Sequence, residues 1–220
     1  AGLDNLTEAA LEANTFEGQI WAFPESTEAV ALYYNTQMVD TPPASTDDLL
    51  ALGPEVGVAL NSQFYYWVGF MFGGEEGMLF DEEQRCVFDT SEGTVGALDF
   101  AQQAQETEGV IVSSQTAEVE AAFKDGTVGL AFSGPWASGD FTAALGEGNV
   151  AVAPPFELSW TDGTFSPFLG TKNFYLSSNV DDQTRDAALA FMNFMSTAEA
   201  QQIMVEQAGH VPSNPDVEVE

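Results

Sequence analysis

The chain has 220 residues, of which 45% are hydrophobic and 12% aromatic, so it can bury a substantial core and is not intrinsically disordered. It carries 35 acidic against 4 basic residues, a formal net charge of -31, with acids in every segment. Because no basic patch exists to meet phosphates, nucleic acid is excluded as a partner.

The charge also predicts the medium in which the protein works. Self-repulsion on this scale destabilises a compact fold in dilute buffer, whereas about 1 M salt shortens the screening length to about 3 Å. We therefore expect an acidic-surfaced protein of a salt-loving organism. A mesophilic acidic protein is the alternative, although such a protein seldom has so few lysines.

Alternating strands and helices predict an α/β fold with a mostly parallel sheet. In chain order we expect a helix over 3–13, strands over 19–23 and 29–34, a helix to residue 51 capped by Ser45 or Thr46, a strand over 56–60, a helix over 64–72, a strand over 85–88, a helix over 91–108, a helix ended by Gly126, strands over 128–132, 150–153 and 174–176, and helices over 184–196 and 198–208.

Burial can be predicted inside two of these elements. Cys86 is the single cysteine, so no intramolecular disulfide forms, and its place in the predicted strand 85–88 indicates a small buried residue. In the helix over 91–108 the residues expected to face inward are Val95, Leu98, Phe100, Ala101 and Ala104. The apolar runs are all shorter than the ~20 residues of a membrane span.

The segment 117–137 predicts a ligand site. Gly126 is suited to the left-handed end of a helix, a buried strand follows, and Pro135 fits the first turn of a new helix. Trp136 thus lies just past the carboxyl end of a buried strand, where open α/β sheets bind ligands. From the residues alone, a core or capping role for Trp136 stays open.

Several segments, in this order along the chain, resemble the extracellular sugar-binding proteins of ABC importers, above all the maltose-binding protein group. The segments are FEGQIWAFP (16–24), EAVALYYN (28–35), TPP (41–43), TDDL (46–49), Gly73-Gly74, AAFKDG (121–126) with GPW (134–136), and SPFLG (166–170).

The resemblance implies a two-lobed, periplasmic-binding-protein-like fold of type II, with sheets flanked by helices. Residues 28–168 would form one complete lobe, and 1–27 and 169–220 would be parts of the other, partial lobe. The chain starts without Met inside the family pattern, so we expect a piece of a longer protein, truncated at both ends. Ligands of such proteins bind in the cleft between lobes, which close by hinge motion.

The resemblance also implies a set of ligand contacts. Aromatic faces stack on the C–H face of a sugar ring, and polar groups bind its hydroxyls. Trp136 would be the stacking residue, with Tyr65 and Tyr66 as further aromatics, although which of these two faces the ligand stays open. Glu28 would accept hydroxyl hydrogen bonds at the first crossing between lobes. At the second crossing lie the remaining candidates, Gly170 and Lys172, and Lys172 could pair with Glu28 instead.

The resemblance implies capture of a maltose-like or oligosaccharide ligand and its delivery to membrane permease subunits. The protein would be an extracellular or periplasmic monomer, anchored as a lipoprotein at full length, with no enzymatic activity, cofactor or bound metal. The family often carries a second Trp two residues after GPW, where this chain has Ser138. Maltodextrin specificity therefore stays open.

Three alternatives remain. The same fold binds iron, polyamines or other small solutes. A carbohydrate hydrolase needs only two carboxylates, although the chain has no G-x-S-x-G elbow and no phosphate-binding glycine loop. The acidic runs could also belong to a metal-binding or purely structural surface protein, but they do not match the spacing of a calcium loop.

Overall fold

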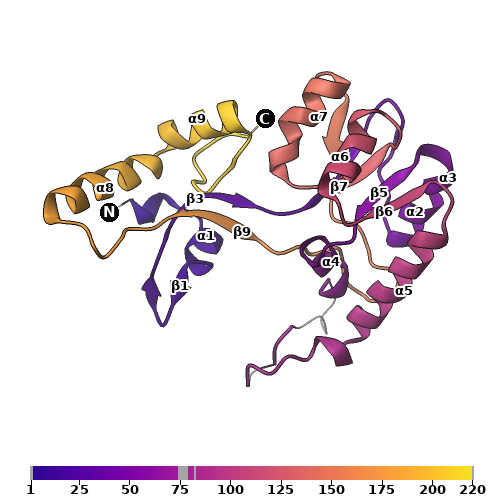
Figure 1. Cartoon of the computed structure of the whole chain (residues 1–220), viewed down its shortest axis with the longest axis horizontal. Helices are drawn as coiled ribbons and strands as arrows, with labels where there is room; N and C mark the ends of the chain where they lie inside the picture. Colours follow the sequence, from indigo (N-terminus) through magenta and orange to yellow (C-terminus); the bar gives the residue numbers. More distant parts are fainter. Residues whose placement is uncertain (1, 74–78, 82, 220) are drawn as a thin grey trace. The chain divides into compact units, whose positions relative to one another are not determined.

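The computed structural model of the chain describes residues 2–73, 79–81 and 83–219, so Gly74 of the predicted Gly-Gly pair lies outside the described residues. The chain divides into two compact units (Figure 1). Unit 1 consists of Ala1–Ala29 with Leu169–Glu220, and unit 2 of Val30–Phe168. Unit 2 therefore begins two residues after the boundary that we predicted and ends at residue 168. Its assignment as one lobe of a longer protein stays a prediction.

Unit 2 is built on a sheet of strand order β6-β5-β7-β4-β8, called here the large sheet. Strand β5 is parallel to β6 and β7, whereas β4 is antiparallel to β7 and β8. The expected parallel arrangement is thus interrupted by β4, which runs antiparallel to both of its neighbours in this sheet. The strands are β4 (Ala31–Asn35), β5 (Val58–Asn61), β6 (Val110–Ser113), β7 (Leu130–Ser133) and β8 (Val150–Val152).

Local signals set the ends of several helices in unit 2. The Ser45 side chain accepts a hydrogen bond from the Asp48 amide at 3.1 Å, so Ser45, one of the two predicted caps, is the residue that caps α2. Gly126 has a φ of +67° just after α6, which confirms the predicted left-handed residue. The helices are α2 (Thr46–Ala51), α3 (Gly53–Val56), α4 (Phe64–Met71), α5 (Glu92–Glu106), α6 (Thr116–Lys124) and α7 (Ser138–Leu145), with short 3-10 turns η2 (Phe88–Thr90) and η3 (Pro135–Ala137).

Each face of the large sheet has its own core. On one face Phe132 packs against Phe70 of α4, with ring centroids 5.4 Å apart, and Phe70 packs against Phe100 of α5 at 5.1 Å. On the other face Ala131 belongs to a cluster with Phe123 of α6 and Phe141 of α7, whose rings are 4.6 Å apart. Adjacent residues of β7 thus point to opposite faces, and helices cover both.

Unit 1 contains an antiparallel sheet of order β10-β3-β9, so the prediction of mostly parallel sheets is wrong here. Its strands and helices are η1 (Leu3–Asn5), α1 (Glu8–Glu12), β1 (Thr15–Phe16), β2 (Gln19–Ile20), β3 (Phe23–Glu28), β9 (Gly170–Phe174), α8 (Asp182–Met195), α9 (Ala198–Ala208) and β10 (Val211–Pro212). The predicted helix over 3–13 is shorter because Thr7 caps α1. The strand predicted at 174–176 instead covers Gly170–Phe174, because Phe174 pairs with Phe23, the first residue of β3.

Two burial predictions in unit 2 are wrong. Cys86 is exposed, and the predicted strand 85–88 is reduced to a single bridge between Phe80 and Cys86. On α5, Val95 and Leu98 are 55% and 57% exposed. Phe100 and Ala104 are buried as predicted, and Gly93 and Ala97 complete the buried stripe of α5, at spacings of three and four residues. Aromatic packing around Phe100 sets this face.

Each of the four basic residues is paired with a nearby acid. The pairs are Arg85 with Asp81 and Glu83, Lys124 with Asp140, Lys172 with Glu28, and Arg185 with Asp182. Most of the 35 acids therefore have no cation beside them. The described part of the chain contains no helix with the length and apolar character needed to cross a bilayer.

The uncompensated charge predicts a strong dependence of stability on salt. Raising KCl from dilute buffer to the molar range should raise the midpoint of thermal unfolding, measured by circular dichroism. Most of the rise should come below about 1 M, because the Debye length falls from about 10 Å at 0.1 M to about 3 Å at 1 M. A midpoint that does not change with KCl would contradict this expectation.

The packing predicts where truncation of a side chain is costly. Phe132→Ala should lower the free energy of unfolding by about 3–5 kcal/mol, because it opens a cavity among Phe70, Phe156 and Phe165. Val95→Ala, at an exposed position, should change it by less than about 0.5 kcal/mol. Denaturant unfolding in molar KCl measures both, and equal losses would place Val95 in the core.

Candidate functional site

Polar residues gather at the carboxyl ends of β5 and β7 in unit 2. Asn61 ends β5 and Ser133 ends β7, and both side chains are buried. Helix α6 ends just before Gly126, and β7 follows and runs antiparallel to it. The first residues of α6 therefore lie at the same end of the sheet as the last residues of β7. Asn61 Nδ2 donates to Oγ1 of Thr116, the first residue of α6, at 2.9 Å. The strand ends and the helix start therefore form one polar layer.

Glu120 of α6 joins this layer to Trp136. Its Oε1 accepts a hydrogen bond from Ser133 Oγ at 2.8 Å and another from the Trp136 indole Nε1 at 3.2 Å. Trp136 is 44% exposed, so its indole combines a fixed polar edge with an accessible surface. We name this group the Trp136 cluster, which consists of Asn61, Tyr66, Thr116, Glu120, Ser133 and Trp136.

The Trp136 indole packs against the backbone of Gly134. A Cβ built on Gly134 would lie 2.1 Å from Cζ3 and 2.2 Å from Cη2 of Trp136, so the six-membered ring packs directly on the glycine backbone. The carbonyl of Gly134 accepts a hydrogen bond from the Tyr33 hydroxyl at 3.1 Å. A side chain at position 134 would displace the indole.

Burial keeps the tyrosines near Glu120 protonated. Burial, with a smaller contribution from the charge of Glu120, raises the pKa of Tyr33 to about 12. Burial also raises the pKa of Tyr66, and the Glu120 charge adds to this, while side-chain hydrogen bonds with Thr116 and Ser133 oppose it. Within the Trp136 cluster, the neutral Tyr66 hydroxyl therefore lies near one carboxylate, that of Glu120.

The structure places the predicted aromatics unequally. Trp136 is accessible, whereas Tyr66 is only 4% exposed, so its ring belongs to the core and its hydroxyl reaches the cluster. Tyr65 is half-buried and packs edge-on against Tyr66, with centroids 5.8 Å apart. Ligand contact by any of the three stays a prediction.

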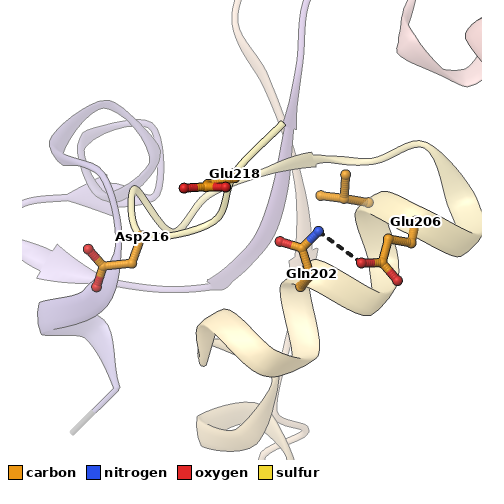
Figure 2. A pocket seen from close by; sticks show the side chains of 5 residues that line it. Gln202, Glu206, Asp216 and Glu218 are labelled. Atoms are coloured by element: carbon orange, nitrogen blue, oxygen red, sulfur yellow. Dashed lines mark hydrogen bonds between the residues drawn. The ribbon is translucent and has the colours of Figure 1, made fainter. Parts of the chain in front are cut away.

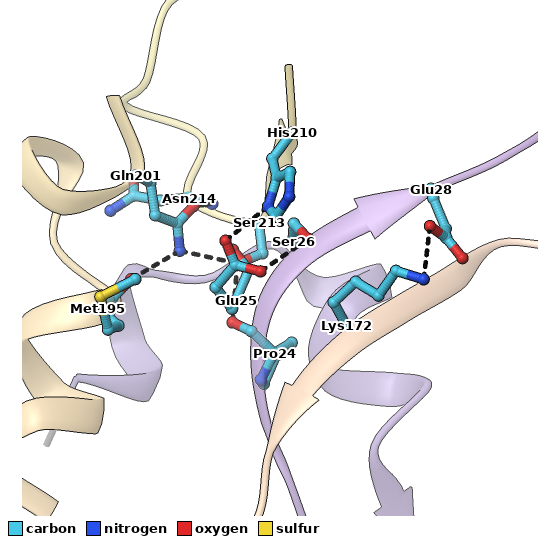
Figure 3. A network of polar contacts seen from close by, with 10 residues as sticks. All are labelled: Pro24, Glu25, Ser26, Glu28, Lys172, Met195, Gln201, His210, Ser213 and Asn214. Carbon is cyan, nitrogen blue, oxygen red and sulfur yellow. Dashed lines mark hydrogen bonds and ion pairs between the residues drawn. The ribbon is translucent and has the colours of Figure 1, made fainter. Parts of the chain in front are cut away.

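The other predicted residues come together in unit 1, on neighbouring strands (Figure 3). Glu28 pairs with Gly170 in the register of β3 and β9. Lys172 Nζ lies 3.0 Å from Glu28 Oε2, so the ion pair given as one role of Lys172 is present. The Lys172 side chain is 59% exposed, and the pair therefore adds little stability. The Lys172 side chain therefore remains accessible, whereas the Glu28 side chain is only 18% exposed.

A second polar network in unit 1 is structural. The Glu25 carboxylate is buried, and its Oε1 lies 2.9 Å from Nδ1 of His210, the only histidine in the chain (Figure 3). Ser26 Oγ donates to Glu25 Oε2, also at 2.9 Å. A serine hydrolase places the imidazole between the serine and the carboxylate, whereas here the carboxylate is in the middle. The network instead attaches the segment after α9 to β3.

One hollow in unit 1 is acidic (Figure 2). Its volume is about 580 Å³, and its lining residues are Gln202, Val205, Glu206, Asp216 and Glu218. Gln202 Nε2 donates to Glu206 Oε1 across one turn of α9, at 3.1 Å. The candidate ligand residues lie elsewhere. Within the described ranges no group of three or more His, Cys, Asp or Glu residues could hold a metal ion.

Glu120 was not predicted from the sequence as a member of the site. Among 35 acids, one more carboxylate carries no signal. The signal that could have found Glu120 was its position in the predicted helix. A helix and the buried strand that follows it pack antiparallel, so a residue in the middle of the helix can face the last residue of the strand. Asn61, at the end of the preceding parallel strand, could have been found by the same argument.

Comparison with known proteins gives a consistent family. The family of bacterial extracellular solute-binding proteins matches residues 1–219. A maltooligosaccharide ABC transporter solute-binding lipoprotein of Streptococcus pneumoniae is 22% identical over 98% of this chain and 54% of its own length. A maltotriose-binding protein of Pyrococcus abyssi is 24% identical over 96% of this chain and 48% of its own length. The chain thus spans about half the length of these curated relatives.

A solved structure supports the same fold. The GacH receptor of Streptomyces glaucescens, determined unliganded and with acarbose, superimposes with a TM-score of 0.82 at 25% identity. The match covers 97% of this chain and 58% of the receptor. The two-lobed type II fold implied by the sequence resemblance is therefore confirmed, with this chain covering part of it.

The contact between Tyr33 and Gly134 predicts an effect of pH. The folded pKa of about 12 exceeds the ordinary value of 10.0, so the stability linked to neutral Tyr33 is fully present below pH 10 and is lost as pH rises toward 12. Tyr33→Phe should cost about 0.5–1.5 kcal/mol at neutral pH, because the Gly134 carbonyl loses the hydroxyl donor and keeps only the Ala137 amide, at 3.1 Å. The free energy of unfolding of Tyr33→Phe should also fall less steeply than that of the wild type as pH rises from 10 toward 12.

Denaturant unfolding between neutral pH and pH 12 measures both effects. Tyr175→Phe is the matched control for loss of a hydroxyl at an exposed position. An alkaline loss in Tyr33→Phe as steep as that of the wild type would contradict the assignment.

Proposed function

Since the chain belongs to the family of bacterial extracellular solute-binding proteins, we propose that it is the solute-capturing part of an ABC importer and that its solute is a carbohydrate. The observation that carries the proposal is the half-exposed, anchored indole of Trp136. A sugar ring packs its C–H face on such an aromatic surface. Glu120, next to the indole, supplies the polar acceptor that the hydroxyl rim needs.

The proposed ligand class is a maltose-like oligosaccharide. The curated relatives are described as binding maltooligosaccharide and maltotriose. A neutral ligand is also consistent with the Trp136 cluster, in which the Tyr66 hydroxyl is protonated at neutral pH and Glu120 is the single carboxylate. A cationic solute such as a polyamine, or ferric iron, would be expected to contact several acids together.

Unit 1 contributes its own proposed contacts. The Glu28 carboxylate accepts sugar hydroxyls, and Lys172 donates from the same ion pair. Gly170 leaves room beside Glu28, because a Cβ there would lie only 3.0 Å from Glu28 Cγ. Within unit 2, the Tyr66 hydroxyl would act from inside the cluster, while Tyr65 supports it through ring packing.

The remaining features of the proposal follow from the family and the charge. The two units act as parts of two lobes, and the protein works outside the cytoplasm as a lipoprotein, a monomer that delivers sugar to permease subunits and carries out no chemistry. The net charge of -31 supports a halophilic origin. A sugar hydrolase is the competing function, and release of shorter sugars from maltooligosaccharides would identify it.

The deciding measurement is thermal unfolding in molar KCl with a panel of solutes, on this chain and on the complete gene product. Maltose and maltotriose should raise the midpoint with concentration, as linkage requires. Glucose, trehalose, cellobiose, phosphate, iron and polyamines complete the panel. A rise caused by iron or a polyamine, with none from any sugar, would replace the carbohydrate with that solute.

Trp136→Ala should weaken binding of the active sugar by about 30-fold, the order expected for a central aromatic contact. Trp21→Ala, at another exposed tryptophan in unit 1, should leave binding unchanged and serves as the control. Isothermal titration calorimetry measures both. Full affinity in Trp136→Ala would remove Trp136 from the site.

A further inference from the structure

We propose that Glu120 is the positioning residue of Trp136, holding the indole in one orientation before the sugar arrives. This inference rests on the proposed function, since it assigns the residue that prepares the stacking surface. A half-exposed tryptophan without anchors would rotate freely, and fixing a side chain on binding costs roughly 0.5–1.5 kcal/mol. Anchoring in the free protein removes that cost.

The indole is held at two edges. At the five-membered ring, Nε1 donates to Glu120 Oε1 at 3.2 Å. At the six-membered ring, Cζ3 and Cη2 pack on the backbone of Gly134. One contact at each end of a planar group fixes both its tilt and its rotation. Removing the hydrogen bond leaves only the packing contact, about which the ring can turn.

Glu120 is itself tied to the sheet. Ser133 Oγ donates to the same oxygen at 2.8 Å, and Ser133 is fully buried at the end of β7. The neighbouring α6 residues Val119 and Phe123 are also fully buried, so the helix cannot shift without disturbing the core. The position of the carboxylate, and through it the indole, is therefore set by the large sheet.

Charge pairing does not account for Glu120. Lys124 lies one turn further along α6, but its ammonium pairs with Asp140 at 3.6 Å. Both described hydrogen bonds of Glu120 are to neutral donors, Ser133 and Trp136. The Glu120 carboxylate accepts one hydrogen bond from Trp136, the proposed ligand contact, and one from Ser133, at the buried end of β7. This is the geometry of a positioning group.

The test compares Glu120→Ala with Glu120→Gln and with a control on the same helix. Glutamine keeps an oxygen that can accept from both donors, whereas alanine removes it. Glu118→Ala also removes one charge and one side-chain hydrogen bond, the one from Ser113 Oγ at 2.6 Å, but it does not touch Trp136. Two readouts are needed: the indole N–H resonance of Trp136, assigned by its loss in Trp136→Phe, and the sugar dissociation constant.

Glu120→Ala should shift the Trp136 indole resonance, speed its hydrogen exchange and raise the sugar dissociation constant roughly three- to ten-fold. Glu120→Gln should restore affinity to within about two-fold, because a neutral acceptor still holds the ring. Glu118→Ala should match the wild type in both readouts. Wild-type resonance and affinity in Glu120→Ala would overturn the proposal.

The two readouts separate this inference from the function on which it rests. If the wild type binds no sugar, the proposed function fails, and the indole resonance still decides whether Glu120 anchors Trp136. If Glu120→Ala does not fold, Ser133→Ala provides the second test. A resonance and affinity unchanged by loss of the Ser133 hydrogen bond would show that the sheet does not hold the carboxylate.

Discussion

The pairing of β4 with β7 is the constraint on which both the core and the candidate site of unit 2 depend. Ala31 lies opposite Ser133, and Tyr34 lies opposite Leu130. Because the strands are antiparallel, the start of β4 lies beside the end of β7, and the Tyr33 hydroxyl reaches the Gly134 carbonyl. A slip of one residue would send Tyr33 to the opposite face of the sheet.

The same register separates the two cores and joins each to the site. Phe132 faces the aromatic cluster of α4 and α5, while Ala131 leaves room for Phe123 and Phe141 on the other face. Ser133 follows directly, and its hydroxyl begins the chain of contacts through Glu120 to Trp136. The accessible indole is thus only two hydrogen bonds away from a fully buried strand residue.

Sequence reasoning succeeded where one residue determines the local structure. Gly126 at the end of α6 was predicted correctly, and Ser45 at the start of α2 was one of the two predicted caps. It failed where distant partners decide, as on α5, where packing on Trp67 and Phe70 selects Phe100 and leaves Leu98 exposed. Local periodicity alone could not choose between these neighbouring faces.

The candidate site shows the same division. Trp136 was predicted from its place after a buried strand and from the family resemblance, whereas Glu120 became visible only when α6 was laid against β7. The pairing of Lys172 with Glu28 was foreseen as one alternative because a base is conspicuous in so acidic a chain. Glu120, as one acid among 35, does not stand out in the sequence in this way.

The way unit 2 interrupts unit 1 has a consequence for the order of folding during synthesis. Residues 30–168 are continuous, so unit 2 can complete its sheet as soon as β8 has left the ribosome. Strand β3 is synthesised before unit 2, but its partners β9 and β10 follow unit 2 in the sequence. Strand β3 must therefore wait unpaired until unit 2 and then β9 (Gly170–Phe174) have been translated.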